Sequence, residues 1–194
     1  MKTKKLTLII VFIALTTALN IAGPKIPAPY APFLIYQLWE IPIVVAFIAI
    51  GPKAGLVITG VNTLILLATF WGALLLGPVY NLIAVFAMLL GVYIPYKVAT
   101  HGCKVENLGK FLQQHVKMIS VAATALGIII RVAVMSAVNY VALQQAPPIG
   151  FALSSGESIA YLPVIAVFNA TVALYTVPIG LGIAIVIASR FKLQ

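Results

Sequence analysis

Acidic residues and cysteine are scarce in this chain of 194 residues. It has three carboxylate side chains, none of them from aspartate, and a single cysteine, Cys103. One cysteine excludes an intramolecular disulfide, and one thiol with two histidines does not make a metal site. His101 and His115 flank a loop that offers neither a paired carboxylate nor a nucleophile motif. We therefore expect no metal, no cofactor and no enzymatic activity.

The signatures of nucleotide and nucleic-acid binding are also missing. No segment matches G-x-x-x-x-G-K-[ST], the loop that holds nucleotide phosphates, so any dependence on ATP must come from a partner. The net charge is +9, but the basic residues stand in the gaps between apolar runs. That placement is typical of charges that set membrane topology, and it argues against nucleic acid as a partner.

Charged residues make up only 8% of the chain, whereas hydrophobic residues make up 63%. A water-soluble domain of this size and composition would expose large apolar patches, so most of the chain is expected to lie in lipid. A membrane-spanning helix needs about 20 mainly apolar residues, and the length accommodates about six. The composition therefore predicts an all-α, integral membrane bundle that forms one domain over residues 1–194.

Apolar runs separated by glycine, proline and charged residues define the expected helices. They cover residues 6–23, 38–50, 54–71, 78–96, 118–143 and 159–189. The first follows a basic start, as a signal peptide does, but its apolar stretch exceeds the usual length of about 7–15 residues and further spans follow. We interpret it as the first transmembrane helix.

Two connecting segments differ in character. Residues 24–37 contain four prolines, which oppose a helix, and several aromatic residues. We expect an apolar loop that lies against the membrane or over the bundle. Residues 97–117 are polar and are expected to form a cytoplasmic loop with one or two amphipathic turns.

The basic residues predict the orientation, because Lys and Arg accumulate in short cytoplasmic loops. If both termini, the turn at Lys53 and the loop 97–117 are cytoplasmic, Lys25 alone lies on the opposite side. The cytoplasmic set is then Lys2, Lys4, Lys5, Lys53, Lys97, Lys104, Lys110, Lys117, Arg190 and Lys192. We expect a multi-pass protein of a prokaryotic plasma membrane.

Two ionisable residues, Glu40 and Arg131, lie at or within apolar runs. A charge at the centre of a bilayer costs about 2.5–3.5 kcal/mol on insertion scales, so such residues are functional candidates. Two structural explanations stay open at this point. Glu40 is two residues into its predicted helix and would be hydrated at the membrane interface. Arg131 would either extend its charged end to the interface, which is called snorkelling, or pair with backbone carbonyls.

Amide and aromatic side chains are candidates for a binding pocket. Amides occur on the four later helices, and an amide in hydrocarbon needs a partner, either another helix or a polar ligand. These amides are Asn62, Asn81, Asn139 and Asn169. Asn81 and Asn139 are expected in the outer half of the membrane, where together with aromatic rings they are suited to an outward-facing pocket for a flat heterocycle. The rings are Tyr36, Trp39, Tyr140 and Tyr161. An interfacial belt of aromatic residues, which also accounts for Trp71 and Tyr80, explains the rings equally well.

Small residues recur on the first helix at Ala14, Ala18 and Ala22. Such a stripe allows another helix backbone to approach closely. It serves either packing within this bundle or docking of a different membrane subunit.

These motifs, taken in order, resemble the substrate-binding S components of energy-coupling factor (ECF) vitamin transporters over nearly the whole chain. The resemblance rests on the alanine stripe, on Glu40-Ile41-Pro42 followed by the Gly51–Gly55 turn, on Arg131 with Met135 and Asn139-Tyr140, and on Pro163 with Phe168-Asn169. The arrangement is most similar to the riboflavin type. One position departs from that pattern, because Val172 stands where a lysine is expected.

The resemblance implies a six-helix protein with both termini in the cytoplasm that captures a vitamin, riboflavin or a related flavin, under its first loop. A transmembrane coupling subunit would hold the alanine stripe, and two cytoplasmic ATPase subunits would supply the energy. The implied substrate contacts are Tyr36, Trp39, Glu40, Asn81, Asn139, Tyr140 and Asn169.

Two other functions are compatible with the sequence. A stand-alone secondary transporter would use Arg131 or Glu40 as a coupling charge. A membrane assembly subunit without a small-molecule ligand would need only the alanine stripe.

Overall fold

The computed structural model describes residues 3–69, 74–101 and 108–190. In chain order, the elements are α1 (Thr3–Ala22), β1 (Ile26–Ala28), β2 (Ala31–Tyr36), α2 (Glu40–Ala49), α3 (Pro52–Thr69), α4 (Gly77–Thr100), α5 (Leu108–Gln144) and α6 (Ser155–Arg190). Trp71, Cys103 and the basic or acidic residues Lys2, Lys104, Glu106 and Lys192 lie outside the described residues.

The six helices correspond to the six predicted apolar runs, and their ends correct the predicted boundaries. The largest correction concerns the segment 97–117, which was expected to be a loop. Helix α4 continues to Thr100 and α5 already begins at Leu108, ten residues before the predicted start. Lys and Gln are good helix formers, so the two helices extend past their apolar parts into polar sequence.

Five of the six helices are long and apolar enough to cross a membrane, and α2 is not one of them. Its 10 residues rise about 15 Å, half of a hydrocarbon core of about 30 Å. The expectation of six spans is therefore corrected to five spans and one short internal helix. Nine residues of α2 are buried, Glu40 and Pro42–Ala49, since this helix packs against α1, α3, α4 and α6.

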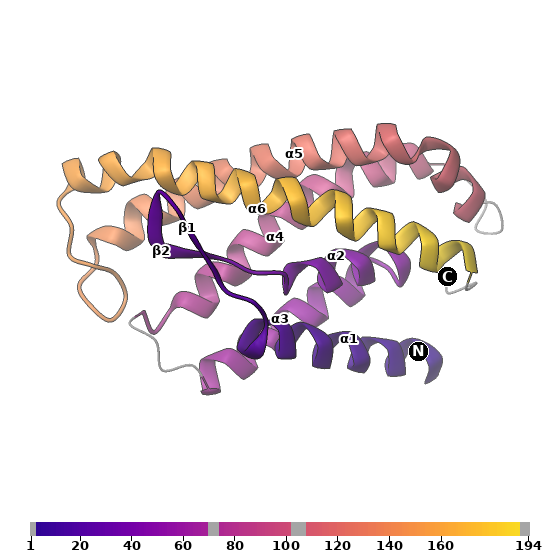
Figure 1. Cartoon of the computed structure of the whole chain (residues 1–194), viewed down its shortest axis with the longest axis horizontal. Helices are drawn as coiled ribbons and strands as arrows, with labels where there is room; N and C mark the ends of the chain where they lie inside the picture. The colour runs from indigo at the N-terminus through magenta and orange to yellow at the C-terminus, as the bar shows by residue number, and fades with distance from the viewer. Residues whose placement is uncertain (1–2, 70–73, 102–107, 191–194) are drawn as a thin grey trace.

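Figure 1 shows how the short helix is placed. Helices α5 and α6 run side by side along one edge of the bundle, and α1 lies at the opposite edge. Both chain ends lie at the same end of the bundle. Helix α2 occupies the half of the bundle nearer to that end, and the segment before it lies in the other half.

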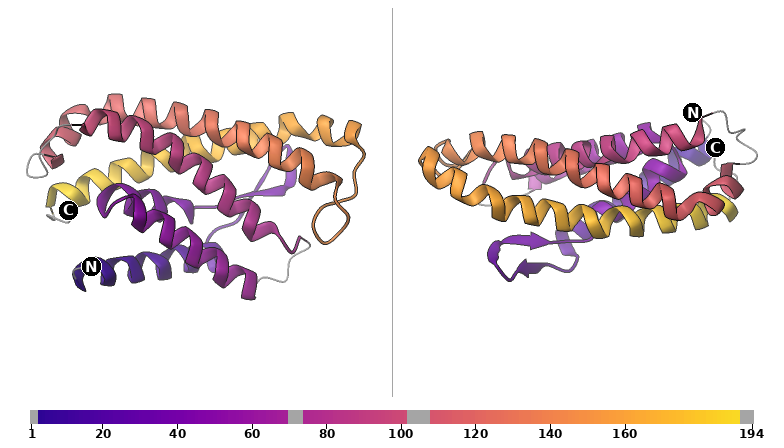
Figure 2. Two further views of the ribbon diagram at one scale, coloured as in Figure 1. Left: turned by 180° about the vertical axis from the view of Figure 1, so that it is seen from behind. Right: turned by 90° about the horizontal axis from the view of Figure 1, so that it is seen from above.

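The proline-rich segment forms a β-hairpin, which the sequence did not predict. Strands β1 and β2 pair antiparallel, with Ile26 opposite Tyr36 and a bulge between Pro27 and Ala28. Pro27 in β1 and Pro32 in β2 cannot donate ladder hydrogen bonds, but a two-stranded hairpin has only edge strands, where proline is tolerated. The hairpin stands out from one face of the bundle, and β2 contacts α6 (Figure 2), so a hairpin takes the place of the expected loop.

The outer surface of the bundle is apolar, as lipid contact requires. Val121 is 71% exposed, Leu64 66% and Ile129 60%, and similar side chains line the outer faces of the other long helices. A patch of this extent on a soluble protein would promote aggregation. Together with the five long apolar helices, it identifies a multi-span membrane protein.

A close crossing of α4 and α5 gives a test of the packing. A Cβ atom added at Gly91 would lie 2.5 Å from the Leu126 carbonyl oxygen and 2.6 Å from Gly127 Cα. We expect Gly91→Ala to lower the free energy of unfolding by about 1–3 kcal/mol, because the two backbones must separate. The measurement is thermal unfolding of the detergent-purified protein.

Gly182→Ala is the matched control, because a Cβ atom at Gly182 meets nothing within 4 Å. This variant should keep or slightly raise the stability, since alanine is the better helix former. Equal losses in the two variants would contradict the described crossing.

Candidate functional site

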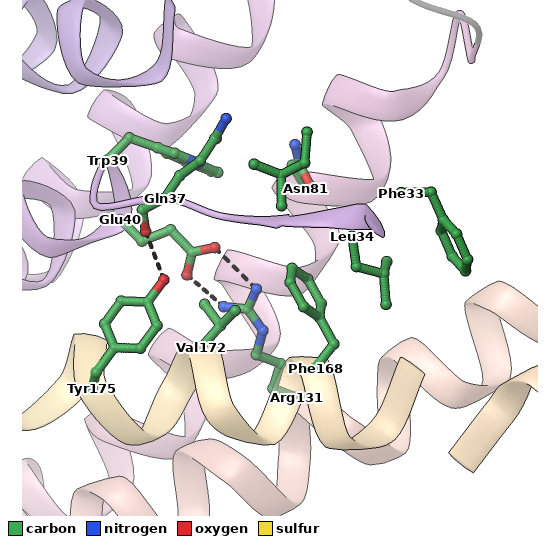
Figure 3. Close-up of a pocket in the computed structure, with 11 residues that line it drawn as sticks. Phe33, Leu34, Gln37, Trp39, Glu40, Asn81, Arg131, Phe168, Val172 and Tyr175 are labelled. Atoms are coloured by element: carbon green, nitrogen blue, oxygen red, sulfur yellow. Dashed lines mark hydrogen bonds and ion pairs between the residues drawn. The ribbon is translucent and has the colours of Figure 1, made fainter. Parts of the chain in front are cut away.

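A cavity of about 280 Å³ lies between the hairpin and the bundle. This volume is just below the range of about 300–1,000 Å³ that is usual for small-molecule pockets, so the cavity has room for one small molecule. It is lined by Phe33, Leu34, Ile35, Gln37, Trp39, Glu40, Asn81, Arg131, Phe168, Val172 and Tyr175 (Figure 3). These residues come from β2, the link to α2, and helices α2, α4, α5 and α6.

The shortness of α2 explains why the cavity exists. Glu40, the first residue of α2, lines the cavity, and among the described residues the chain ahead of it contributes strand β2 and the link 37–39 instead of a helix. The chain instead covers this space with β2 and the residues that follow it. The cavity therefore lies at the amino-terminal end of α2, in the half of the bundle away from the chain ends.

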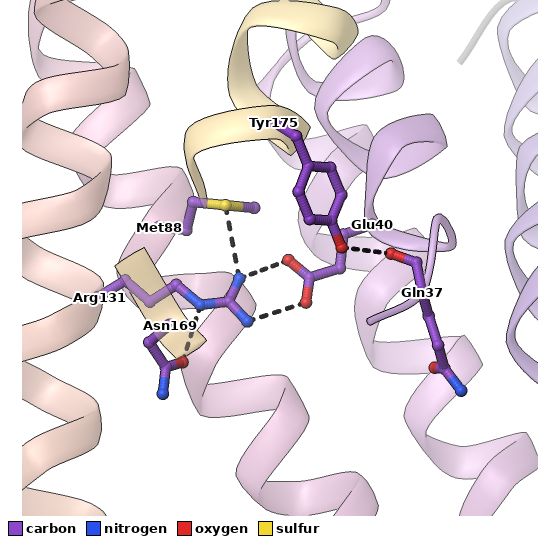
Figure 4. A network of polar contacts seen from close by, with 6 residues as sticks. All are labelled: Gln37, Glu40, Met88, Arg131, Asn169 and Tyr175. Atoms are coloured by element: carbon purple, nitrogen blue, oxygen red, sulfur yellow. Dashed lines mark hydrogen bonds and ion pairs between the residues drawn. The ribbon is translucent and has the colours of Figure 1, made fainter. Parts of the chain in front are cut away.

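A buried ion pair between Arg131 and Glu40 forms the polar floor of the cavity (Figure 4). The guanidinium binds the carboxylate with both terminal nitrogens, Nη2 to Oε1 at 2.9 Å and Nη1 to Oε2. Nε donates to Asn169 Oδ1 at 3.0 Å, and Nη1 also contacts Met88 Sδ at 3.5 Å. Arg131 is 3% exposed and Glu40 4%, so both charges are withdrawn from water.

The positions of Glu40 and Arg131 on their helices favour the ion pair between them. Glu40 is in the first turn of α2, where the helix dipole favours a negative charge. Arg131 is on α5, and the bidentate geometry is the one in which a guanidinium binds a carboxylate most strongly. Neither structural explanation left open by the sequence applies, because Glu40 is buried and Arg131 pairs with a carboxylate and a side-chain amide.

Aromatic rings fasten the hairpin to α6 beside the cavity. Tyr36 packs on Phe168 at a ring-centroid distance of 5.0 Å and meets Tyr175 edge-on at 6.3 Å. The Tyr175 hydroxyl donates to the Gln37 carbonyl oxygen at 2.6 Å. Tyr30 and Tyr36 share a hydrogen bond across the hairpin, and desolvation together with this bond raises the pKa of Tyr30 to about 12. The Tyr30 hydroxyl therefore stays protonated, and the contact persists, at physiological pH.

The structure brings together part of the predicted binding set. Trp39, Glu40 and Asn81 line the cavity, and Arg131, which was predicted only as an intramembrane charge, lines it too. Asn169 lies behind the floor, where its amide holds Arg131 Nε and donates to the Ile165 carbonyl oxygen at 3.0 Å. Tyr36 belongs to the adjoining aromatic contacts.

Asn139 and Tyr140 are not among the residues that line the cavity. The Asn139 amide donates to the Met135 carbonyl oxygen one turn earlier, at 2.7 Å, and Tyr140 is 37% exposed. Asn62 is also absent from the lining and is buried within α3. Asn139 finds its partner on its own helix, whereas the buried Asn62 Oδ1 has no hydrogen-bond partner among the described residues.

Several lining residues were missed by the sequence reasoning. Phe168, Val172 and Tyr175 follow one another at helical spacings of four and three, so they lie on one face of α6. That spacing, beside the already noted Phe168-Asn169, was a signal that would have found them. No comparable signal identified Phe33, Leu34, Ile35 and Gln37, because the hairpin itself was not predicted.

The alanine stripe lies on the outside of the molecule. Ala14, Ala18 and Ala22 are exposed, whereas the buried residues of α1 are Ile9, Thr16 and Asn20. At 100° per residue the two sets lie on opposite sides of the helix. The stripe therefore faces away from the rest of the described bundle.

Comparison with solved structures identifies the fold. The structure of the S component of a bacterial ECF transporter superposes on this chain with a TM-score of 0.65 and 23% sequence identity, over 97% of this chain and 93% of that one. The chain has the S-component fold. No family model matches the sequence, and no curated protein matches it.

The superposition covers 97% of this chain, so the likeness is not confined to one part of the bundle. The resemblance inferred from short motifs is therefore confirmed at the level of the fold, although the motifs themselves are degenerate.

The ion pair provides a stability test. Removing one partner of a buried pair leaves an uncompensated charge and costs about 3–5 kcal/mol, whereas replacing both by apolar residues is often close to neutral. We expect Glu40→Met and Arg131→Met each to lower the free energy of unfolding by about that amount. The double variant should be more stable than either single variant, as measured by thermal unfolding in detergent. Losses that simply add would show that the two charges do not stabilise each other.

Proposed function

We propose that this chain is the substrate-binding subunit of an ECF-type importer in a prokaryotic plasma membrane. The single observation that carries the proposal is a cavity, roofed by a hairpin and floored by a buried ion pair, in a chain with the S-component fold. The cavity is of a size for one small molecule, and its lining combines aromatic faces with a few polar groups, as small-molecule sites do. In this proposal the chain captures the molecule and partner subunits supply the energy.

The charges favour an orientation in which the cavity faces outward. Both chain ends lie at the end of the bundle away from the cavity. Lys4 and Lys5 are at the start of α1, Lys53 at the start of α3, and Lys97 near the end of α4, all at that same end. Since Lys and Arg accumulate on the cytoplasmic side, we place this end inside the cell. The hairpin then covers the cavity on the outer half.

The proposed cargo is a vitamin with a flat ring system, and riboflavin or a related flavin is the first candidate. Trp39, Phe168 and Tyr175 supply aromatic faces for stacking, and the Gln37 and Asn81 amides supply hydrogen-bonding groups. These rings favour a flat heterocycle over an aliphatic solute, because only the heterocycle stacks on them.

The alanine face of α1 is the proposed contact for a transmembrane coupling subunit. Its small side chains are exposed and unpartnered within the described bundle, and a small-residue face permits close approach of another helix. The sequence has no phosphate-binding loop. ATP hydrolysis is accordingly assigned to two partner ATPase subunits.

Ligand binding is tested first. We expect the detergent-purified chain to carry a small molecule in native mass spectrometry, or to bind one member of a vitamin panel that begins with riboflavin. A bound flavin would also give visible absorbance and quenched fluorescence. A ligand-free protein that binds no member of the panel would contradict the proposed function.

The coupling face is tested by enlarging the alanines. The triple variant Ala14→Leu, Ala18→Leu, Ala22→Leu should bind its ligand as the wild type does, because these side chains are remote from the cavity. Uptake in cells that supply the coupling and ATPase subunits should fall at least about tenfold, since a bulky face prevents close helix approach.

Helix α5 offers a matched control, because Ala125, Ala133 and Ala137 are also exposed alanines. Their replacement by leucine adds the same volume to another outer face and should leave uptake unchanged. Equal losses of uptake in both triple variants would argue that the effect is not specific to α1.

A further inference from the structure

Six buried polar side-chain atoms have no hydrogen-bond partner among the described residues, and they are unevenly distributed. Four of them are on α1 and α3, two helices that contribute no residue to the lining of the cavity. These four are Thr16 Oγ1, Thr17 Oγ1, Asn20 Nδ2 and Asn62 Oδ1. Buried polar groups in native proteins are paired with other protein groups or with ordered water. The concentration of such atoms on two neighbouring helices therefore indicates a shared partner.

The Thr16 hydroxyl is turned away from its own helix. Six other helical threonines donate to the carbonyl oxygen four residues earlier, as Thr59 does at 2.8 Å. Thr16 makes no such bond, although it is fully buried. It shares one face of α1 with Ile9 and Asn20, because the three residues follow at helical spacings of seven and four. The Thr16 hydroxyl and the Asn20 amide are thus presented together to the interior of the bundle.

Helix α3 supplies the facing polar group. Helix α1 packs against α3 and α2. The one polar side chain of α2 is that of Glu40, and both of its oxygens bind Arg131. On α3, the hydroxyls of Thr59 and Thr63 donate to backbone carbonyl oxygens of their own helix. Asn62 is 1% exposed and its Oδ1 is unpaired, so it is the group on α3 that is available to the polar face of α1.

These groups lie at a similar depth in the bundle. Helices α1 and α3 both run away from the end that holds the chain ends, and α1 extends farther toward that end (Figures 1 and 2). At about 1.5 Å per residue, Thr16 and Asn20 lie about 20 Å and about 26 Å along α1, and Asn62 lies about 15 Å along α3. Because α1 begins farther out, we place Asn62 beside the turn of α1 that contains Thr16 and Asn20.

The chemistry of the three groups fits a water molecule. Asn20 presents an N–H donor, Asn62 presents an acceptor, and the Thr16 hydroxyl serves as either. Asn20 and Asn62 do not bond directly to each other. A water molecule offers both donors and acceptors, and buried waters make about three hydrogen bonds. A hard cation would take oxygen ligands alone, and the Asn20 N–H would oppose it.

We propose that α1 and α3 hold a buried water molecule between them, at a site formed by Thr16, Asn20 and Asn62. The water accepts from the Asn20 Nδ2–H, donates to Asn62 Oδ1 and shares a third hydrogen bond with the Thr16 hydroxyl. It joins α1 to the bundle on the side of the helix opposite the exposed alanines. The inference is independent of the proposed function, because none of the three residues lines the cavity.

A crystal structure of the detergent-purified chain in which ordered water is resolved tests the site directly. We expect a peak about 2.7–3.2 Å from Thr16 Oγ1, Asn20 Nδ2 and Asn62 Oδ1. A direct hydrogen bond between Asn20 and Asn62, or an interface without such a peak, would overturn the proposal. A peak with contacts of about 2.3–2.6 Å to oxygen atoms alone would also overturn it, because that is the geometry of a bound cation.

Thermal unfolding in detergent tests whether the three side chains share one partner. Asn20→Leu and Asn62→Leu each leave the other polar groups of the site incompletely paired, and each should lower the Tm by roughly 2–8 °C. The triple variant Thr16→Val, Asn20→Leu, Asn62→Leu leaves none of the three groups to be paired. Its loss of Tm should therefore be smaller than the sum of the two single losses. A triple loss equal to or larger than that sum would rule out a shared water molecule.

Thr69→Val is the matched control on α3. Thr69 is exposed, and its hydroxyl donates to the Ile65 carbonyl oxygen of its own helix at 2.8 Å. This change should shift the Tm by less than about 2 °C, and its effect should add to that of Asn20→Leu. Coupling of Asn20 to Thr69 as strong as its coupling to Asn62 would show that the effect is general to α3, and the proposed site would then be wrong.

Discussion

The buried pairing of Arg131 with Glu40 is the interaction on which the rest of the arrangement depends. Two full charges in a lipid-embedded bundle are tolerated only because each satisfies the other, with Asn169 binding the remaining side of the guanidinium. The pair joins α2 to α5, and Asn169 adds α6. It therefore fixes the depth at which α2 begins, and that depth determines where the cavity lies.

The short helix α2 does not extend through the whole thickness of the bundle, and this leaves room for the cavity. Helix α2 lies in the half of the bundle nearer to the chain ends, and β2 and the residues that follow it line the cavity in the other half. The hairpin is held by the stacking of Tyr36 on Phe168 and by the Tyr175 hydroxyl, with few contacts besides. Irregular backbone at membrane depth is tolerated where it lines a cavity, which is the position of the link between β2 and α2.

Helix α1 has two faces with different roles. Its buried face carries Ile9, Thr16 and Asn20 toward the bundle, and its outer face carries the alanines. The ligand cavity is built from β2, the link to α2, and helices α2, α4, α5 and α6, without a contribution from α1. Ligand capture and the proposed docking of a coupling subunit are therefore placed on separate parts of the molecule, and each can be altered without the other.

The sequence by itself determined the fold class, the number of helices and the presence of two charges at or within apolar runs, because apolar run length and the placement of charge along the chain are local properties. It also placed the alanines on one side of α1, since helical periodicity is a property of a single element. Only the tertiary structure decided that Glu40 meets Arg131 across 91 residues and that Asn139 lies outside the cavity. These facts depend on how helices are placed against one another and on a proline-rich segment that forms a hairpin. No local pattern encodes either.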